Sequence, residues 1–131
     1  MAGGITIDAG VLVAAERNDQ KFWMYWRTLA HVQKVVPTPV LAQVWRGDAS
    51  IPLLRALEGC LIEPLFEDDA KAAGELCART RSKDVVDATV MVSAARRRDD
   101  ILTTDVRDLR RLTAGLRFSG RIIDFDRLAN P

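Results

Sequence analysis

Short apolar runs alternate along the chain with longer stretches of helical periodicity. The apolar runs predict strands at residues 5–8, 35–36, 60–65, 101–104 and 121–125. The stretches between them predict helices at residues 9–17, 21–33, 39–46, 51–57, 68–81, 84–98 and 106–113. Because parallel strands need crossover connections, which helices supply, the pattern predicts a three-layer α/β/α fold with a mostly parallel central sheet.

The same pattern predicts which segments are buried. The helix at 84–98 is apolar on nearly every side, so we expect it in the centre of the domain. Thr38 followed by Pro39 predicts a helix start with Thr38 as the cap, and Gly47 predicts its end. Trp45 continues an apolar helical stripe, so we expect it in the core.

Length and composition place the chain in a single domain, residues 1–131, with no repeat or linker. No apolar run approaches the roughly 20 residues that a membrane span needs. The N-terminus lacks the layout of a signal peptide, and Cys60 and Cys77 form no C-x-x-C pair. We therefore expect a cytoplasmic protein with reduced thiols and no membrane partner.

Charge is unevenly distributed, although the net charge is only +1. Residues 1–75 carry 7 Lys/Arg and 10 Asp/Glu, and residues 76–131 carry 12 and 8, which gives −3 and +4. The positive part contains Arg79, Arg81, Lys83 and the run 96–98. A polyanion such as RNA would use such a face. A solvated helix end explains the arginine run equally well, because cations favour helix C-termini.

Four carboxylates stand where strands end or where the buried helix begins. Asp8 closes the first strand, Asp105 and Asp108 follow the fourth, and Asp87 lies in the first turn of the helix at 84–98. Ligands of open parallel sheets bind beyond the carboxyl ends of the strands. Clustered carboxylates repel by roughly 3 kcal/mol per pair at ~5 Å, so a divalent cation is expected among them. Hard oxygen ligands favour Mg²⁺ or Mn²⁺.

Helix capping is the simpler interpretation of each acid taken alone. Asp8 can cap the helix that begins at residue 9, Asp84 and Asp87 can form a capping box, and Asp105 can cap the next helix, with Asp108 in its first turn. The joint occurrence favours the metal site. Asp87 in particular is flanked by apolar residues, and a buried carboxylate needs a partner.

The sequence contains few of the residues and motifs that other catalytic mechanisms need. His31 is the only histidine, which excludes paired-histidine nuclease mechanisms and histidine-rich zinc sites. Neither a G-x-x-x-x-G-K-[ST] loop nor a G-x-G-x-x-G turn is present. Dehalogenase-type phosphatases need D-x-D after the first strand and receiver domains need a late lysine, and neither pattern occurs.

Four segments stand in order along nearly the whole chain: Ile7-Asp8-Ala9-Gly10, the segment 38–47 (TPVLAQVWRG), Val85-Val86-Asp87-Ala88, and the segment 102–109 (LTTDVRDL). Together they resemble the PIN domain, and more narrowly the VapC toxins of bacterial type II toxin–antitoxin pairs. The resemblance implies a Mg²⁺- or Mn²⁺-dependent endoribonuclease. By motif position Asp8 and Asp87 are the principal metal ligands, with Asp105 as a further ligand. Asp108 completes the acidic pocket, and Thr104 positions water or phosphate.

The resemblance also implies partners. Single-stranded RNA is the expected substrate, a VapB-like antitoxin the expected inhibitor, and a homodimer the expected base unit. The aromatic segment 22–26 favours core packing, and the alternative is a partly exposed groove for the antitoxin.

Gln43 stands where this family usually places Glu. An amide can accept a hydrogen bond or hold a water molecule, but it has no charge and cannot act as a base. We expect a working site with altered metal affinity. The alternative is a catalytically impaired PIN module that binds RNA or antitoxin without cleavage.

Overall fold

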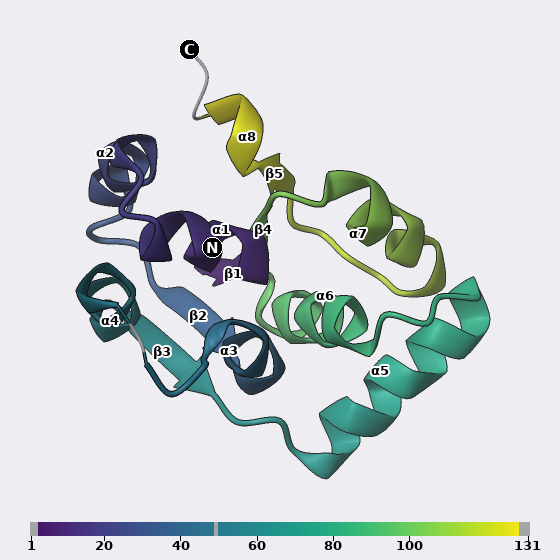
Figure 1. Cartoon of the computed structure of the whole chain (residues 1–131). Coiled ribbons are helices and arrows are strands. Elements are labelled where there is room, and N and C mark those ends of the chain that lie inside the picture. The colour runs from purple at the N-terminus through teal and green to yellow at the C-terminus, as the bar shows by residue number, and fades with distance from the viewer. Residues whose placement is uncertain (1–2, 49, 129–131) are drawn as a thin grey trace.

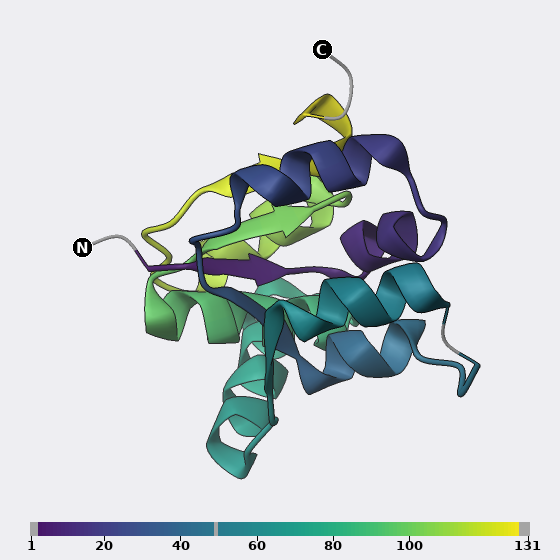
Figure 2. The ribbon, with the colours of Figure 1, turned by 90° about the vertical axis from the view of Figure 1, so that its left-hand side faces the viewer.

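A five-stranded parallel sheet forms the centre of the computed structural model, which describes residues 3–48 and 50–128. The strand order is β3-β2-β1-β4-β5, and every neighbouring pair is parallel. The strands are β1 (Ile5–Ile7), β2 (Lys34–Pro37), β3 (Cys60–Glu63), β4 (Asp100–Thr103) and β5 (Ile122–Asp124). All of them point the same way, so their carboxyl ends meet at one edge of the sheet (Figure 2).

Helices connect the strands and cover both faces of the sheet, which confirms the predicted α/β/α fold (Figure 1). They are α1 (Ala9–Glu16), α2 (Gln20–Thr28), α3 (Thr38–Val44), α4 (Ile51–Glu58), α5 (Glu67–Thr80), α6 (Val85–Arg97), α7 (Val106–Leu112) and α8 (Phe125–Leu128), with a 3-10 turn at Thr113–Gly115. α6 packs on β1, β2 and β4, and α5 packs on α6. α3 lies between α1 and α6. None of the described helices is long and apolar enough to cross a membrane.

The core confirms the central position predicted for α6. Ala88, Val90, Met91 and Ala94 of this helix are fully buried. On α2, Phe22 and Trp26 stack with ring centroids 4.7 Å apart and are buried, which confirms core packing for these two aromatic residues.

Trp45 lies outside the core, so the expectation for this residue was wrong. α3 ends at Val44, and the backbone of Trp45 is extended, with φ −78° and ψ 126°. The indole therefore leaves the helical stripe that would have buried it, and it remains 42% exposed. It lines an open apolar groove beside Leu41, Leu57 and Ile62.

Most element boundaries differ from the predicted ones by a few residues; α3, for example, ends at Val44 and not at Gly47. Three of these differences change an element or its cap. Thr38 is the first residue of α3 and not its cap, and its hydroxyl accepts a hydrogen bond from the Leu65 N–H (3.2 Å). α2 ends at Thr28, five residues before the predicted end, because the chain turns after the buried Leu29 to reach β2. The last strand stops at Asp124, and the helix α8 that follows it was not predicted.

Two members of the arginine run 96–98 are engaged in ion pairs. Arg97 is half-buried and pairs with Glu63 and with Asp99, whose side chain is 1% exposed. Arg96 pairs with Glu63 and Asp69. Arg97 therefore belongs to a partly buried network of charges, whereas Arg98 is exposed as expected for a solvated helix end. RNA binding by this run stays a prediction. The run also lies at the C-terminal end of α6, about 15 Å along the helix from Asp87.

Candidate active site

Carboxylates from three elements meet at the carboxyl edge of the sheet. Asp8 follows β1, Asp105 follows β4, and Asp87 lies in the first turn of α6. Asp87, Asp105 and Asp108 each offer an oxygen atom, and these atoms lie within 4.8 Å of one another. Residues that are far apart in the chain therefore form one acidic cluster.

Asp8 is buried next to this cluster and is held by two hydrogen bonds. Its Oδ1 accepts from the Ala9 N–H (2.8 Å), which makes it the cap of α1, as the capping interpretation predicted. Its Oδ2 accepts from the Thr103 hydroxyl (2.7 Å). Burial raises the pKa of Asp8, the two hydrogen bonds oppose that shift, and the charge of Asp84 adds to it. Asp8 is thus fixed in orientation and lies within the electrostatic reach of the other acids.

Asp87 is the least satisfied acid of the site. Its residue is 6% exposed, and its Oδ2 is the one buried side-chain oxygen or nitrogen of the described residues that has no hydrogen-bond partner. Burial is the largest cause, and together with the charges of Asp8, Asp84 and Asp105 it raises the pKa of Asp87 to about 8. Buried carboxylates are stable only when a partner compensates the lost hydration. A cation at this oxygen would supply that compensation.

Asp105 and Asp108 complete the cluster from the start of α7. Asp105 occupies the position before the helix, but its side chain makes no capping hydrogen bond, so the capping interpretation was wrong for this residue. Burial raises the pKa of Asp105, and the neighbouring Asp108 raises it as well. Asp108 is exposed in the first turn of α7. Asp105 interacts with both the side chain and the backbone of Asp108, and each of the two carboxylates offers an oxygen atom to the cluster.

Thr103 and Asp84 belong to the site although the sequence did not single them out for it. The fully buried Thr103 hydroxyl donates to Asp8 and accepts from the Asp105 N–H (2.9 Å), so it links two of the acids. Asp84 caps α6 by accepting from the Asp87 N–H (3.0 Å), which confirms half of the proposed capping box. Its charge raises the pKa of both Asp8 and Asp87, so it acts as a fifth carboxylate.

Gln43 and Thr104 are not part of the group of three carboxylate oxygen atoms that Asp87, Asp105 and Asp108 form. Gln43 is exposed on α3, the helix that packs between α1 and α6. Thr104 is exposed and packs against Gly10, where a Cβ atom would come within 1.9 Å of its hydroxyl oxygen. Gly10 is therefore required for the close approach of α1 to the end of β4. The roles of Gln43 and Thr104 stay predictions.

The donor set fits a divalent cation. All its ligand atoms are carboxylate oxygens, the type that Mg²⁺ and Mn²⁺ prefer, and one of them is buried without a partner. The raised pKa values of three acids have the same causes, which are burial first and then the like charges of neighbouring carboxylates. An all-parallel α/β/α domain with this cluster defines a protein suited to bind a divalent cation at the carboxyl edge of its sheet.

The family model of the PIN domain matches residues 5–114, and the chain belongs to this family. The matched range contains all five carboxylates of the site. PIN domains are generally nucleases, which hydrolyse phosphodiester bonds. Among curated protein sequences no match was found.

Solved structures share the fold at low sequence identity. A toxin–antitoxin complex from Klebsiella pneumoniae has 17% identity and a TM-score of 0.67, over 86% of this chain and 92% of that chain. VapBC2 from Rickettsia felis, bound to a DNA fragment from its promoter, has 14% identity and a TM-score of 0.67, over 92% and 96%. PAE2754 from Pyrobaculum aerophilum has 20% identity and a TM-score of 0.57, over the full length of both chains. These likenesses confirm the predicted PIN fold.

Proposed function

We propose that this protein is a Mg²⁺- or Mn²⁺-dependent endoribonuclease, a VapC-like toxin that hydrolyses RNA and is neutralised by a cognate antitoxin. Membership of a family of nucleases supports the reaction class. The observation that carries the metal dependence is Asp87, a buried carboxylate whose Oδ2 lacks a partner and whose neighbours are further carboxylates. Without a cation, the neighbouring carboxylate charges repel one another and disfavour the ionised form of Asp87.

Asp87, Asp105 and Asp108 would hold the cation, with Asp8 beside them. When bound, Mg²⁺ or Mn²⁺ lowers the pKa of a water molecule and neutralises charge on the scissile phosphate. Thr103 keeps Asp8 and the backbone of Asp105 in a fixed relation, because its hydroxyl bonds to both. The chain therefore fixes Asp8 and the start of α7 before the substrate arrives, which reduces the reorganisation that catalysis would otherwise require.

The toxin assignment draws on the solved structures with the same fold. Two of them are described as a toxin–antitoxin complex and as VapBC2 bound to promoter DNA. By analogy we propose a VapB-like antitoxin as partner, a homodimer as the base unit, single-stranded RNA as substrate and the cytoplasm as location.

A PIN module that binds RNA or antitoxin without cleavage is the second candidate. Gln43 favours it, because the amide removes one charge from the position where the family usually has Glu. Asp84 argues against it, because this fifth carboxylate acts on Asp8 and Asp87 and keeps the site strongly acidic.

The test is cleavage of single-stranded RNA by the purified protein with Mg²⁺, with Mn²⁺ or with EDTA. We expect cleavage with either metal, none with EDTA and none by the Asp87→Asn variant. Asp48→Asn is the matched control, because it removes one exposed carboxylate outside the site. Binding of RNA without cleavage under any of these metal conditions would favour the non-catalytic module. A parallel readout is growth arrest on induction of each variant in cells that lack the antitoxin.

A further inference from the structure

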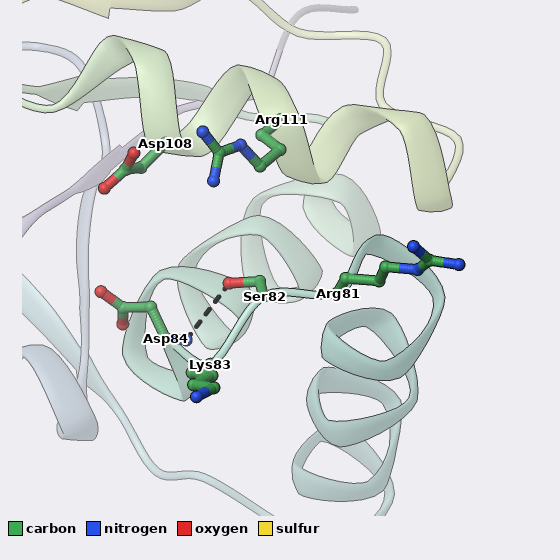
Figure 3. A pocket seen from close by; sticks show the side chains of 6 residues that line it. All are labelled: Arg81, Ser82, Lys83, Asp84, Asp108 and Arg111. Carbon is green, nitrogen blue, oxygen red and sulfur yellow. Dashed lines mark hydrogen bonds between the residues drawn. The ribbon is translucent and has the colours of Figure 1, made fainter.

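A charged cavity of about 340 Å³ lies beside the acidic cluster. One wall is the connection between α5 and α6, with Arg81, Ser82, Lys83 and Asp84, and the other is α7, with Asp108 and Arg111 (Figure 3). Asp108 belongs to the acidic cluster, and the charge of Asp84 raises the pKa of Asp87 in the same cluster. The cavity is therefore continuous with the site proposed to hold the cation.

Three cations line this cavity, and within residues 3–48 and 50–128 none of them forms an ion pair. They are Arg81, Lys83 and Arg111. Some arginines of the C-terminal half are already engaged: Arg97 pairs with Glu63 and Asp99, and the Arg79 Nε donates to the Gly115 carbonyl (2.9 Å). Others, such as Arg98 and Arg117, are exposed on other parts of the surface, so the three cations are set apart because they line a cavity next to the acids.

Local structure explains why these cations gather there. Arg81 adopts the left-handed conformation (φ 57°) that ends α5, and the Ser82 N–H returns to the Cys77 carbonyl (3.0 Å). The Ser82 hydroxyl then accepts from the Asp84 N–H (3.2 Å), which orders the short connection. On α7, Arg111 follows Asp108 by three residues, so both occupy the same face of the helix. Figure 3 shows the Arg111 guanidinium directed towards Asp108, whereas Arg81 extends outward at the far end.

We propose that this cavity binds the phosphate next to the scissile one in a single-stranded RNA substrate, with Arg111 as the main positioning residue. The proposal rests on the proposed function, because it places the scissile phosphate at the acidic cluster. RNA carries a phosphate at every nucleotide, so a strand held at the acids presents its next phosphate to the adjoining surface. A guanidinium binds phosphate through two parallel hydrogen bonds, and the neighbouring Lys83 and Arg81 add positive potential.

The experiment measures binding of a fluorescent 12-nucleotide single-stranded RNA of mixed sequence, with Ca²⁺ in place of Mg²⁺, at several salt concentrations. We expect Arg111→Ala to weaken binding about tenfold. We also expect it to lower the slope of log K against log salt by about 0.7, the value of one phosphate contact on a single strand. Arg110→Ala is the matched control, because this exposed neighbour on the same helix does not line the cavity. Arg111→Lys should recover part of the affinity, since it keeps the positive charge but cannot form the two parallel hydrogen bonds of a guanidinium.

Equal effects of Arg111→Ala and Arg110→Ala would overturn the proposal, because they would reveal a general electrostatic attraction. Unchanged RNA affinity of Arg111→Ala, with or without weaker antitoxin binding, would overturn it as well. Cleavage in Mn²⁺ is measured in parallel and tests the proposed function separately. If wild type cleaves, Arg111→Ala should raise KM and leave kcat nearly unchanged. If wild type binds RNA without cleaving it, the cavity is still tested by the change in affinity.

Discussion

Replacement of Asp87 by Asn should make the metal-free protein more stable while it removes the response to metal. Asn has nearly the same shape as a protonated Asp, so it keeps the packing of α6 on the sheet. It removes the charge that the neighbouring carboxylates repel. At the 4.8 Å that spans the cluster, two unit charges repel by about 3.5 kcal/mol at an effective dielectric of 20. Exposure of Asp108 screens part of this, so we expect a gain of about 2 kcal/mol at pH 8.

The gain should depend on pH in a defined direction. The pKa of Asp87 rises from 3.8 to about 8 in the folded protein, so between these values the folded state holds a proton that the unfolded chain has lost. Stability of the wild type therefore falls as pH rises from about 4 to 8 and levels off above that. Because solvent screens the cluster, we expect a total loss of about 2 kcal/mol, which is less than the 1.36 kcal/mol per pH unit of one fully exchanged proton. An amide does not titrate, so Asp87→Asn should lack this part of the decline. The two proteins should be nearly equal in stability near pH 4.

The assay is unfolding in EDTA, followed by circular dichroism between pH 4 and 9. For a chain of this length, 2 kcal/mol corresponds to a rise in Tm of about 6–10 °C at pH 8. Addition of 10 mM Mg²⁺ should stabilise wild type and leave Asp87→Asn unchanged, because only a bound ligand shifts the unfolding equilibrium. Asp48→Asn, which removes an exposed charge elsewhere, should follow wild type. A loss of stability for Asp87→Asn at pH 8, or a pH profile parallel to wild type, would refute the account of Asp87 as an uncompensated buried acid.

Three further substitutions test the site and the fold. Thr103→Val should cost about 2 kcal/mol in urea unfolding, because it leaves a buried carboxylate oxygen and a backbone N–H without partners, whereas Thr104→Val should cost less than about 0.5. Gln43→Glu should tighten Mg²⁺ binding about fivefold by calorimetry, since it adds a charge near the cation; unchanged affinity would place this side chain outside the metal shell. Arg97→Met should destabilise the protein by about 3 kcal/mol, because the acids that it pairs lose their counter-charge, while the exposed Arg98→Met should be neutral; equal stability of the two variants would count against the buried network.

Periodicity was sufficient to predict the strands and most helices, because alternation of apolar runs and helical stretches is local information. It failed where tertiary structure decides. The helical periodicity of α2 continues past Thr28, but the connection to β2 requires a turn there. The apolar stripe of α3 continues to Trp45, but the helix ends one residue earlier. Helix α8 has only four residues, too few for a periodic pattern to be recognised.

The candidate site was predictable to a different degree. Asp87 could be predicted because its flanking residues are apolar, which indicates burial, and a buried carboxylate needs a partner that compensates its lost hydration. Thr103 and Thr104 are chemically identical neighbours, and only the pairing of β4 with β1 places the hydroxyl of Thr103 against Asp8. Asp84 was assigned to helix capping alone, and its effect on the pKa of Asp8 became visible only when the loop before α6 was placed beside β1.

Helix α6 has a group of charged side chains at each end. The acids of one group are paired with arginine, and those of the other are not. At its C-terminal end Arg97 satisfies Glu63 and Asp99, and Asp99 in turn accepts from the Gly4 N–H (2.7 Å) and the Thr6 hydroxyl (2.9 Å). This end joins the helix to strands β1 and β3 with every charge compensated. At its N-terminal end Asp87 meets only further acids, and the cations that could neutralise it stand apart along the neighbouring cavity. The same helix thus anchors the sheet at one end and leaves an unbalanced negative site at the other. The acids at one end of α6 are paired with arginine, whereas the Asp87 carboxylate at the other end has no cationic partner in the described residues. We therefore expect the counter-charge of Asp87 to come from a bound ligand.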